Sequence, residues 1–129
     1  MNTDLDVGSP QFQIFAVLEA QKWLDLLTDW VTLSHNLVVV HYEKLKLDQE
    51  REIRKIMQFF GIKENEKRLK CMKMMKFEWF RRNKKVMKKN PYSQAANTKL
   101  SEVIKTAQNL LEQYNHEYLP LHLYPYYIT

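Results

Sequence analysis

The spacing of hydrophobic residues predicts a mostly helical chain with one long helix near its start. Between residues 12 and 31 large hydrophobic side chains recur at steps of three, four and seven, which is typical of one face of an amphipathic helix. Ser9 and Pro10 are residue types that commonly begin a helix. We therefore predict a helix over 11–31, with a hydrophobic face made by Phe12, Phe15, Trp23, Leu26, Leu27 and Trp30.

Three further helices are predicted along the chain. Residues 48–60 have a helical pattern that begins with the acidic Asp48, favoured at a helix N-terminus, and ends before Gly61. A second helix is predicted over 64–76, with Leu69 and Met72 facing inward. The clearest pattern predicts a helix over 98–115, whose regularly spaced hydrophobic residues are Leu100, Val103, Ile104, Ala107, Leu110, Leu111 and Tyr114. We expect the proline-rich and aromatic C-terminal tail to pack as an extended segment.

The stretch "LVVVHY" predicts a single buried β-strand over 37–42. Its residues are apolar on both faces until the last two, as expected of a strand covered on both sides in a parallel or mixed sheet. A buried strand needs neighbours for its backbone groups, and no second convincing strand exists in the chain. The fold class is therefore predicted as α/β, with the chain forming one end of a larger domain. A homodimeric sheet with one strand from each chain is the rarer alternative.

Positive charge is concentrated in one segment. Residues 63–89 contain twelve basic and three acidic residues, a net charge of +9, whereas the rest of the chain carries −4. Residues 77–96 show no steady period and include Asn90-Pro91, so we predict a long basic loop there. Within it, "FRRNKK" places two arginines and two lysines that could hold a phosphate or sulfate: Arg81, Arg82, Lys84 and Lys85. A solvated basic surface is the alternative, and nucleic-acid binding would use the same residues.

The carboxyl end of the predicted strand is the other candidate site, because ligands of open α/β sheets bind there. Tyr42 could place its ring against a planar base and offer its hydroxyl to a polar edge. The alternative is that Tyr42 completes the core and Glu43 caps a turn. His41 has no Asp or Cys at a recognisable spacing, so we interpret it as structural.

Other chemical signatures are missing from the sequence. Gly8 and Gly61 are the only glycines, so there is no glycine-rich phosphate loop, and no metal-binding or nucleophile motif is present. The single cysteine, Cys71, cannot form an intrachain disulfide. No apolar run approaches the roughly 20 residues of a membrane span, and the polar start lacks the order of a signal peptide, so we expect neither.

Several motifs together resemble the C-terminal half of sulfotransferases that use 3′-phosphoadenosine 5′-phosphosulfate (PAPS). They are the tryptophan pair Trp23 and Trp30, the stretch "VVVHYEKLKLDQEREIRKIMQFFGI", and the basic "FRR" loop. The chain looks closest to the WSC-domain-containing sulfotransferases, whose "VVHYE-x-L" strand and "FRR" loop before an Asn-Pro segment are similar to Val39–Leu45, Phe80–Lys85 and Asn90-Pro91. The similarity runs from about Phe15 to about Leu119.

The resemblance implies a function that composition and spacing do not show. It implies the C-terminal portion of a P-loop-like sulfotransferase domain, which would bind PAPS as co-substrate without a metal and transfer sulfate to a hydroxyl acceptor, most often a glycan, in the Golgi membrane or lumen. Tyr42 would border the adenine, and Arg81, Arg82 and Lys84 would lie near the 3′-phosphate. Where many relatives have Thr-Ser-Phe, this chain has Met75-Lys76-Phe77, so the threonine contact with adenine is not expected.

The same resemblance implies an incomplete site. The family's 5′-phosphosulfate loop, its catalytic Lys or His and its Arg and Ser contacts with the 3′-phosphate precede the matching region, so we assign no catalytic residue and expect no transfer by this chain alone. No nucleic-acid partner is expected on this reading. The alternative function is a non-enzymatic basic helical module that binds nucleic acid or acidic polymers.

Overall fold

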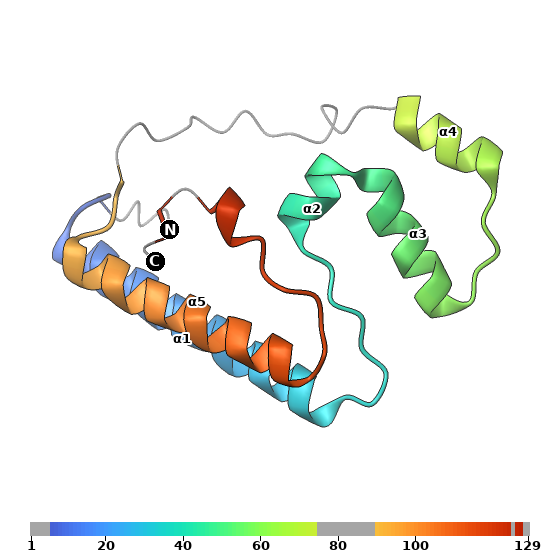
Figure 1. Cartoon of the computed structure of the whole chain (residues 1–129). Coiled ribbons are helices and arrows are strands. Elements are labelled where there is room, and N and C mark those ends of the chain that lie inside the picture. The colour runs from blue at the N-terminus through green and yellow to red at the C-terminus, as the bar shows by residue number, and fades with distance from the viewer. Residues whose placement is uncertain (1–5, 75–89, 125, 128–129) are drawn as a thin grey trace, which may run out of the picture. The chain divides into compact units, whose positions relative to one another are not determined.

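The computed structural model describes residues 6–74, 90–124 and 126–127, and these residues form two compact units. Unit 1 is built from Met1–Leu37 together with Met87–Thr129, and unit 2 is Val38–Val86. Every regular element in the described residues is a helix (Figure 1).

Unit 1 is a pair of long helices, α1 (Pro10–Leu33) and α5 (Gln94–Gln113), that pack along their length and run in the same direction (Figure 1). Each begins at a serine whose hydroxyl accepts a backbone N–H three residues on: Ser9 from Phe12 at 3.2 Å, and Ser93 from Ala96 at 3.1 Å. These are standard N-caps that satisfy a backbone donor of the first helical turn. Leu24, Val31, Ala107 and Leu111 are buried in this unit.

The N-terminal ends of the two helices are joined by one side chain, Gln13. Its Nε2 donates to the carbonyl of Pro91 at 2.8 Å, and its Oε1 accepts the backbone N–H of Ser93 at 2.8 Å. The Gln13 amide therefore bonds the residues on both sides of Tyr92. The Tyr92 ring also stacks on Phe12, with centroids 6.0 Å apart. These contacts fix where α5 starts beside α1.

The C-terminal segment folds back within unit 1. After α5, Asn115 takes a positive φ of 58°, and the backbone N–H of His116 donates to the carbonyl of Leu111 at 2.8 Å. Gln108 Oε1 then accepts the backbone N–H of Leu119 at 2.7 Å. The tail, which the sequence predicts as extended, contains a short 3₁₀ helix, η2 (Leu121–Leu123).

The described residues of unit 2 form three helices in sequence order, α2 (Tyr42–Leu47), α3 (Gln49–Phe60) and α4 (Glu66–Met74). The side chain of Asp48 caps α3 by accepting the backbone N–H of Arg51 at 3.2 Å. Gly61 ends α3 with φ of +66°, and the N–H of Ile62 donates to the carbonyl of Met57 at 2.9 Å. This is the Schellman arrangement, which requires the left-handed conformation that glycine adopts most easily.

The strand predicted over 37–42 is wrong for the residues that the structure describes. Residues 37–41 have no regular structure, and Tyr42 is the first residue of α2 rather than the end of a strand. His41 keeps an extended backbone, with φ −94° and ψ 125°. The sequence favours an extended segment, but a strand forms only when another strand pairs with its backbone, and the described residues contain no such strand.

The other predicted boundaries differ by a few residues. Helices are predicted over 11–31, 48–60, 64–76 and 98–115, where α1, α3, α4 and α5 are observed. The predicted loop over 77–96 overlaps the first turn of α5, which begins at Gln94, and its residues 77–89 lie outside the described part. None of the helices among the described residues is long and apolar enough to cross a membrane.

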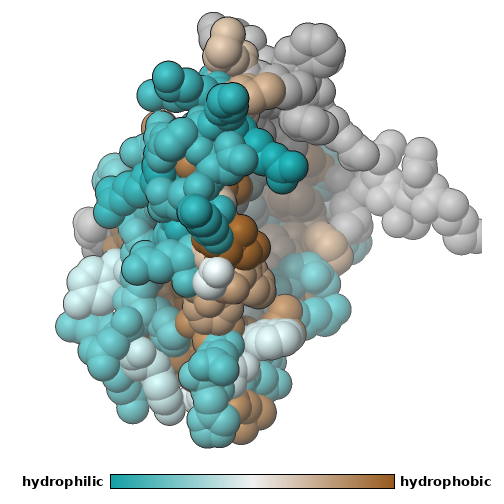
Figure 2. All heavy atoms as spheres, turned by 90° about the vertical axis from the view of Figure 1, so that its right-hand side faces the viewer, coloured by the Kyte–Doolittle hydropathy of each residue, from teal (hydrophilic) through white to brown (hydrophobic). Residues whose placement is uncertain are grey.

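The hydrophobic face assigned to α1 from its spacing only partly coincides with the one that packs, because Phe12 and Leu27 are half-buried but other members are exposed. Phe15, Leu26 and Trp30 are 48%, 59% and 57% exposed, whereas Leu24 and Val31 are buried. The helix carries large apolar side chains on both sides, so spacing alone did not identify the side that α5 covers. Figure 2 shows one face of the molecule, on which a band of hydrophobic side chains lies among mostly hydrophilic ones.

Candidate functional site

Tyr42, the sequence-predicted base-binding residue, is open to solvent. It is the first residue of α2, directly after the extended His41, and 60% of its surface is exposed. One turn later on the same helix, the Lys46 ammonium lies over the tyrosine ring, 5.6 Å from its centroid. An exposed aromatic ring with a positive charge above it can stack on a planar base and attract an anionic ligand.

The segment before Tyr42 is held against α3 by Lys55. The Lys55 ammonium donates a 2.7 Å hydrogen bond to the carbonyl of Val39. The ammonium also lies 3.9 Å from Oε2 of Glu52, whose side chain is 2% exposed. A lysine thus satisfies one backbone carbonyl to which the N–H of a neighbouring strand would otherwise donate, and this contact fixes the approach to Tyr42.

Glu52 is the one fully buried carboxylate that the structure describes in unit 2. Its Oε2 makes no hydrogen bond with any described residue. Neither Glu52 nor Lys55 was singled out from the sequence. The pattern that could have indicated them is a pair of opposite charges three residues apart within an amphipathic helix.

The two neighbours of Tyr42 are less exposed. His41 is 7% exposed and occupies the N-cap position of α2 without a side-chain capping bond. Glu43 lies in the first turn of α2 and is partly buried. The buried position of His41 agrees with the structural role inferred from its sequence surroundings.

A cluster of charges connects α3 with α4 and the segment between them. The Arg54 guanidinium bonds Glu50 at 2.7 Å and Glu66 at 3.2 Å, and it also pairs with Glu64. The Lys73 ammonium lies 3.5 Å from the second oxygen of Glu50. The hydrogen bond from Arg54, with the charge of Lys73, lowers the pKa of Glu50, and the bonds to Glu66 and Glu50 raise the pKa of Arg54. Each of these three carboxylates is paired with a basic group, so we interpret the cluster as structural.

The basic residues predicted to bind phosphate lie outside the described residues. Arg81, Arg82 and Lys84 fall between residues 75 and 89, so the structure brings only Tyr42 of the predicted site onto a defined element. Among the residues that are described, no three His, Cys, Asp or Glu side chains gather to hold a metal ion. Cys71 is an exposed free thiol.

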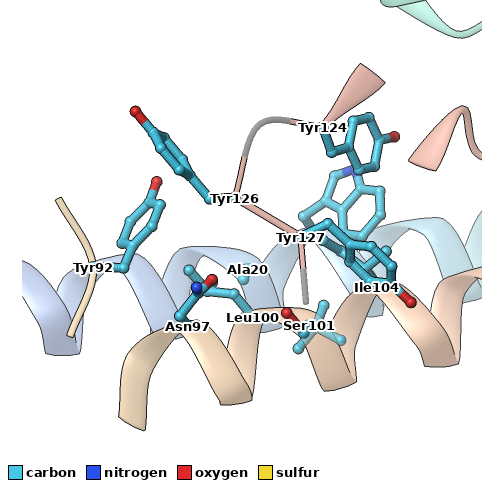
Figure 3. Close-up of a pocket in the computed structure, with 11 residues that line it drawn as sticks. Ala20, Tyr92, Asn97, Leu100, Ser101, Ile104, Tyr124, Tyr126 and Tyr127 are labelled. Carbon is cyan, nitrogen blue, oxygen red and sulfur yellow. The ribbon is translucent and has the colours of Figure 1, made fainter. Parts of the chain in front are cut away.

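Unit 1 contains an aromatic pocket that was not predicted from the sequence. Its volume is about 310 Å³, and it lies among α1, α5 and the C-terminal segment (Figure 3). Three tyrosines of the tail contribute to it together with one that lies just before the N-cap of α5: Tyr124, Tyr126, Tyr127 and Tyr92. The concentration of tyrosines at residues 124–127 was the available signal, but only the fold shows which helices they cover.

The chain matches a known protein family, and no solved structure matches it. The family model is described as "Sulfotransferase domain", and it matches residues 13–116. The match includes most of α1, Tyr42, the charged cluster of α3 and all of α5. Since the model covers most of its length, this chain belongs to the sulfotransferase domain family.

Proposed function

We propose that the chain forms the C-terminal part of a nucleotide-binding site for PAPS, with Tyr42 bordering the adenine. The observation that carries the proposal is the sulfotransferase family match over residues 13–116, because members of this family take sulfate from that donor. The exposed ring of Tyr42 with the Lys46 ammonium above it is a suitable surface for a purine that carries phosphates.

Arg81, Arg82 and Lys84 complete the proposed site at the 3′-phosphate of the donor. Arginine binds phosphate through paired hydrogen bonds, and lysine adds a point charge. The assignment of these three residues rests on the resemblance of the "FRR" loop to that of related sulfotransferases.

The acceptor in this proposal is a hydroxyl group, most simply on a glycan. It rests on the resemblance of "VVHYEKL" and the "FRR" loop to WSC-domain-containing sulfotransferases. The same resemblance favours the Golgi as the compartment.

The test is calorimetric titration of the full chain with adenosine 3′,5′-bisphosphate, the donor without its sulfate-bearing group. We expect Tyr42→Ala to weaken binding by roughly 5- to 100-fold, since stacking of a base on an aromatic side chain contributes about 1–3 kcal/mol. Tyr42→Phe keeps the ring and should bind like the wild type. Tyr114→Ala removes another exposed tyrosine, at the end of α5, and is the matched control.

A second comparison tests the residues proposed to bind the 3′-phosphate. Arg82→Ala should weaken binding of adenosine 3′,5′-bisphosphate but leave adenosine 5′-monophosphate unchanged, because only the former has a 3′-phosphate. Unchanged bisphosphate affinity in both Tyr42→Ala and Arg82→Ala would contradict the proposal. Tight, salt-dependent binding of an oligonucleotide without binding of the bisphosphate would instead favour the basic helical module.

A further inference from the structure

The pocket in unit 1 is lined by surfaces suited to an uncharged, flat ligand. Aromatic rings and aliphatic side chains make most of its lining, and the ionisable residues that line it are the tyrosines. Ala20 of α1 contributes only a methyl group, which leaves space opposite α5. A pocket of about 310 Å³ with this lining is within the size range of small-molecule sites.

One polar side chain in this apolar pocket lacks a hydrogen-bond partner. Asn97 of α5 is 8% exposed and lines the pocket, and its side-chain amide makes no hydrogen bond with any described residue. Figure 3 shows the Asn97 side chain directed from α5 toward the side on which Tyr92 and Tyr126 lie. The amide borders the pocket, where it can both donate to and accept from a ligand.

The walls on this side of the pocket are held in place by contacts of their own. Tyr92 lies between two rings: it stacks on Phe12, and it meets Tyr126 edge to face with centroids 6.1 Å apart. The backbone on both sides of Tyr92 is fixed by the Gln13 amide. A ligand would therefore enter a largely formed site, which lowers the entropic cost of binding.

We propose that this pocket binds a neutral planar aromatic molecule with one hydrogen-bonding group on its edge, which pairs with the Asn97 amide. The ring would lie among the tyrosines and the apolar side chains of α5, where neither a carboxylate nor an ammonium among the described residues meets it. The site is contained within unit 1, so it is independent of the donor site proposed at Tyr42 in unit 2.

The test uses indole and indene, which have nearly the same shape but differ in one N–H group. Titration of the full chain by ligand-observed and protein-observed NMR gives both dissociation constants. We expect indole to bind about three- to tenfold more tightly than indene, because one hydrogen bond typically increases affinity by about this factor. In Asn97→Leu the preference should fall to about one, with indene binding retained and folding intact because the replaced amide has no partner.

Filling the pocket should remove binding of both ligands. Ala20→Phe places a ring in the space beside α5, and Leu100→Trp fills it from the other helix if the first variant fails to fold. Ala95→Phe is the matched control. Ala95 is on α5, like Leu100, but it lines a separate hollow of about 290 Å³ that has no aromatic residue. The control should bind both ligands like the wild type.

Three results would overturn the proposal. They are the absence of saturable binding to the wild type, equal affinities of indole and indene for the wild type, and binding that persists in both filled variants. Loss of nucleotide binding in Tyr42→Ala has no bearing on it, so failure of one proposal is distinguishable from failure of the other.

Discussion

At the scale of single residues, Gln13 makes the polar connection between the beginnings of α1 and α5. Its two hydrogen bonds, both 2.8 Å long, reach backbone groups 78 and 80 residues further along the chain. Both bonds are made by one uncharged amide, so their contribution does not depend on pH or salt.

We predict that Gln13→Ala lowers the free energy of unfolding by about 1–3 kcal/mol, because it removes two hydrogen bonds and leaves their backbone partners in need of water. Urea unfolding followed by circular dichroism measures this change. Gln21→Ala, which removes an exposed bond to Asp25 on the same helix, should change stability by less than about 0.5 kcal/mol. Equal effects of the two substitutions would show that the Gln13 contacts do not hold the helices together.

Glu50 is a carboxylate whose pKa the structure lowers. Arg54 and Lys73 lower its pKa below the ordinary 4.5, so the folded protein binds its proton less readily than the unfolded chain does. The stabilisation is therefore fully present above about pH 4.5 and is lost as the pH falls through the lower pKa of the folded state.

We predict that the urea midpoint of the wild-type chain falls as the pH is lowered below about 4.5, and that Glu50→Gln removes part of this fall. The variant should also be less stable than the wild type at pH 7, where the ion pairs are intact. Glu102→Gln, which removes an exposed pair with Lys99 on α5, serves as the control. An identical pH profile for wild type and Glu50→Gln would rule out this source of acid sensitivity.

At the scale of elements, α1 is unusual in carrying hydrophobic residues on two opposite faces. Leu24 and Val31 lie on the buried face, while Trp30 and Leu33 are 57% and 74% exposed. Exposed apolar surface of this kind often marks an interaction site. What covers the second face is a question about the larger domain that the sequence pattern predicts.

The two faces can be compared with one type of substitution. We predict that Leu24→Ala, at 8% exposure, destabilises the chain by about 2–4 kcal/mol, whereas Leu26→Ala, at 59% exposure, changes stability by less than about 0.5 kcal/mol. Thermal or urea unfolding of the two variants measures the difference. A larger effect for Leu26→Ala would mean that the face predicted from spacing is the packed one.

How well each element could be predicted depended on whether its signals were local. Asp48 and Gly61 bracket α3 in the sequence, and both act as caps in the structure, because capping depends on residues within one turn. The short α2 was missed because "YEKLKL" directly follows a run of β-branched residues. Strand pairing is not local, so the sequence of residues 37–42 could not show whether partners were present.

At the scale of the whole molecule, the candidate site could be predicted only in part. Tyr42 is proposed because it follows an apolar segment; the structure places it exposed on α2, and its role in binding the donor stays a prediction. The aromatic pocket could not be predicted, because Tyr92 and Tyr126 meet only when the chain beyond α5 folds back. The assignment of Arg81 and Arg82 stays a prediction.

We predict that this chain alone does not transfer sulfate from labelled PAPS to glycan or other hydroxyl acceptors. Its residues include no glycine-rich loop for the 5′-phosphosulfate. Thin-layer separation of labelled products, with an active sulfotransferase as positive control, measures transfer. Acceptor-dependent labelled product from the purified chain would contradict the prediction.

The division of unit 1 between the two ends of the chain bears on how fast each unit folds. Unit 2 is formed by helices that follow one another directly, so its contacts are close in sequence. In unit 1, α1 and α5 meet only after the intervening residues of unit 2 are closed into a loop. Loop closure costs entropy before any distant contact compensates for it, and folding slows as contacts become more distant. Unit 2 should therefore form first, and docking of α5 onto α1 should be the slow step.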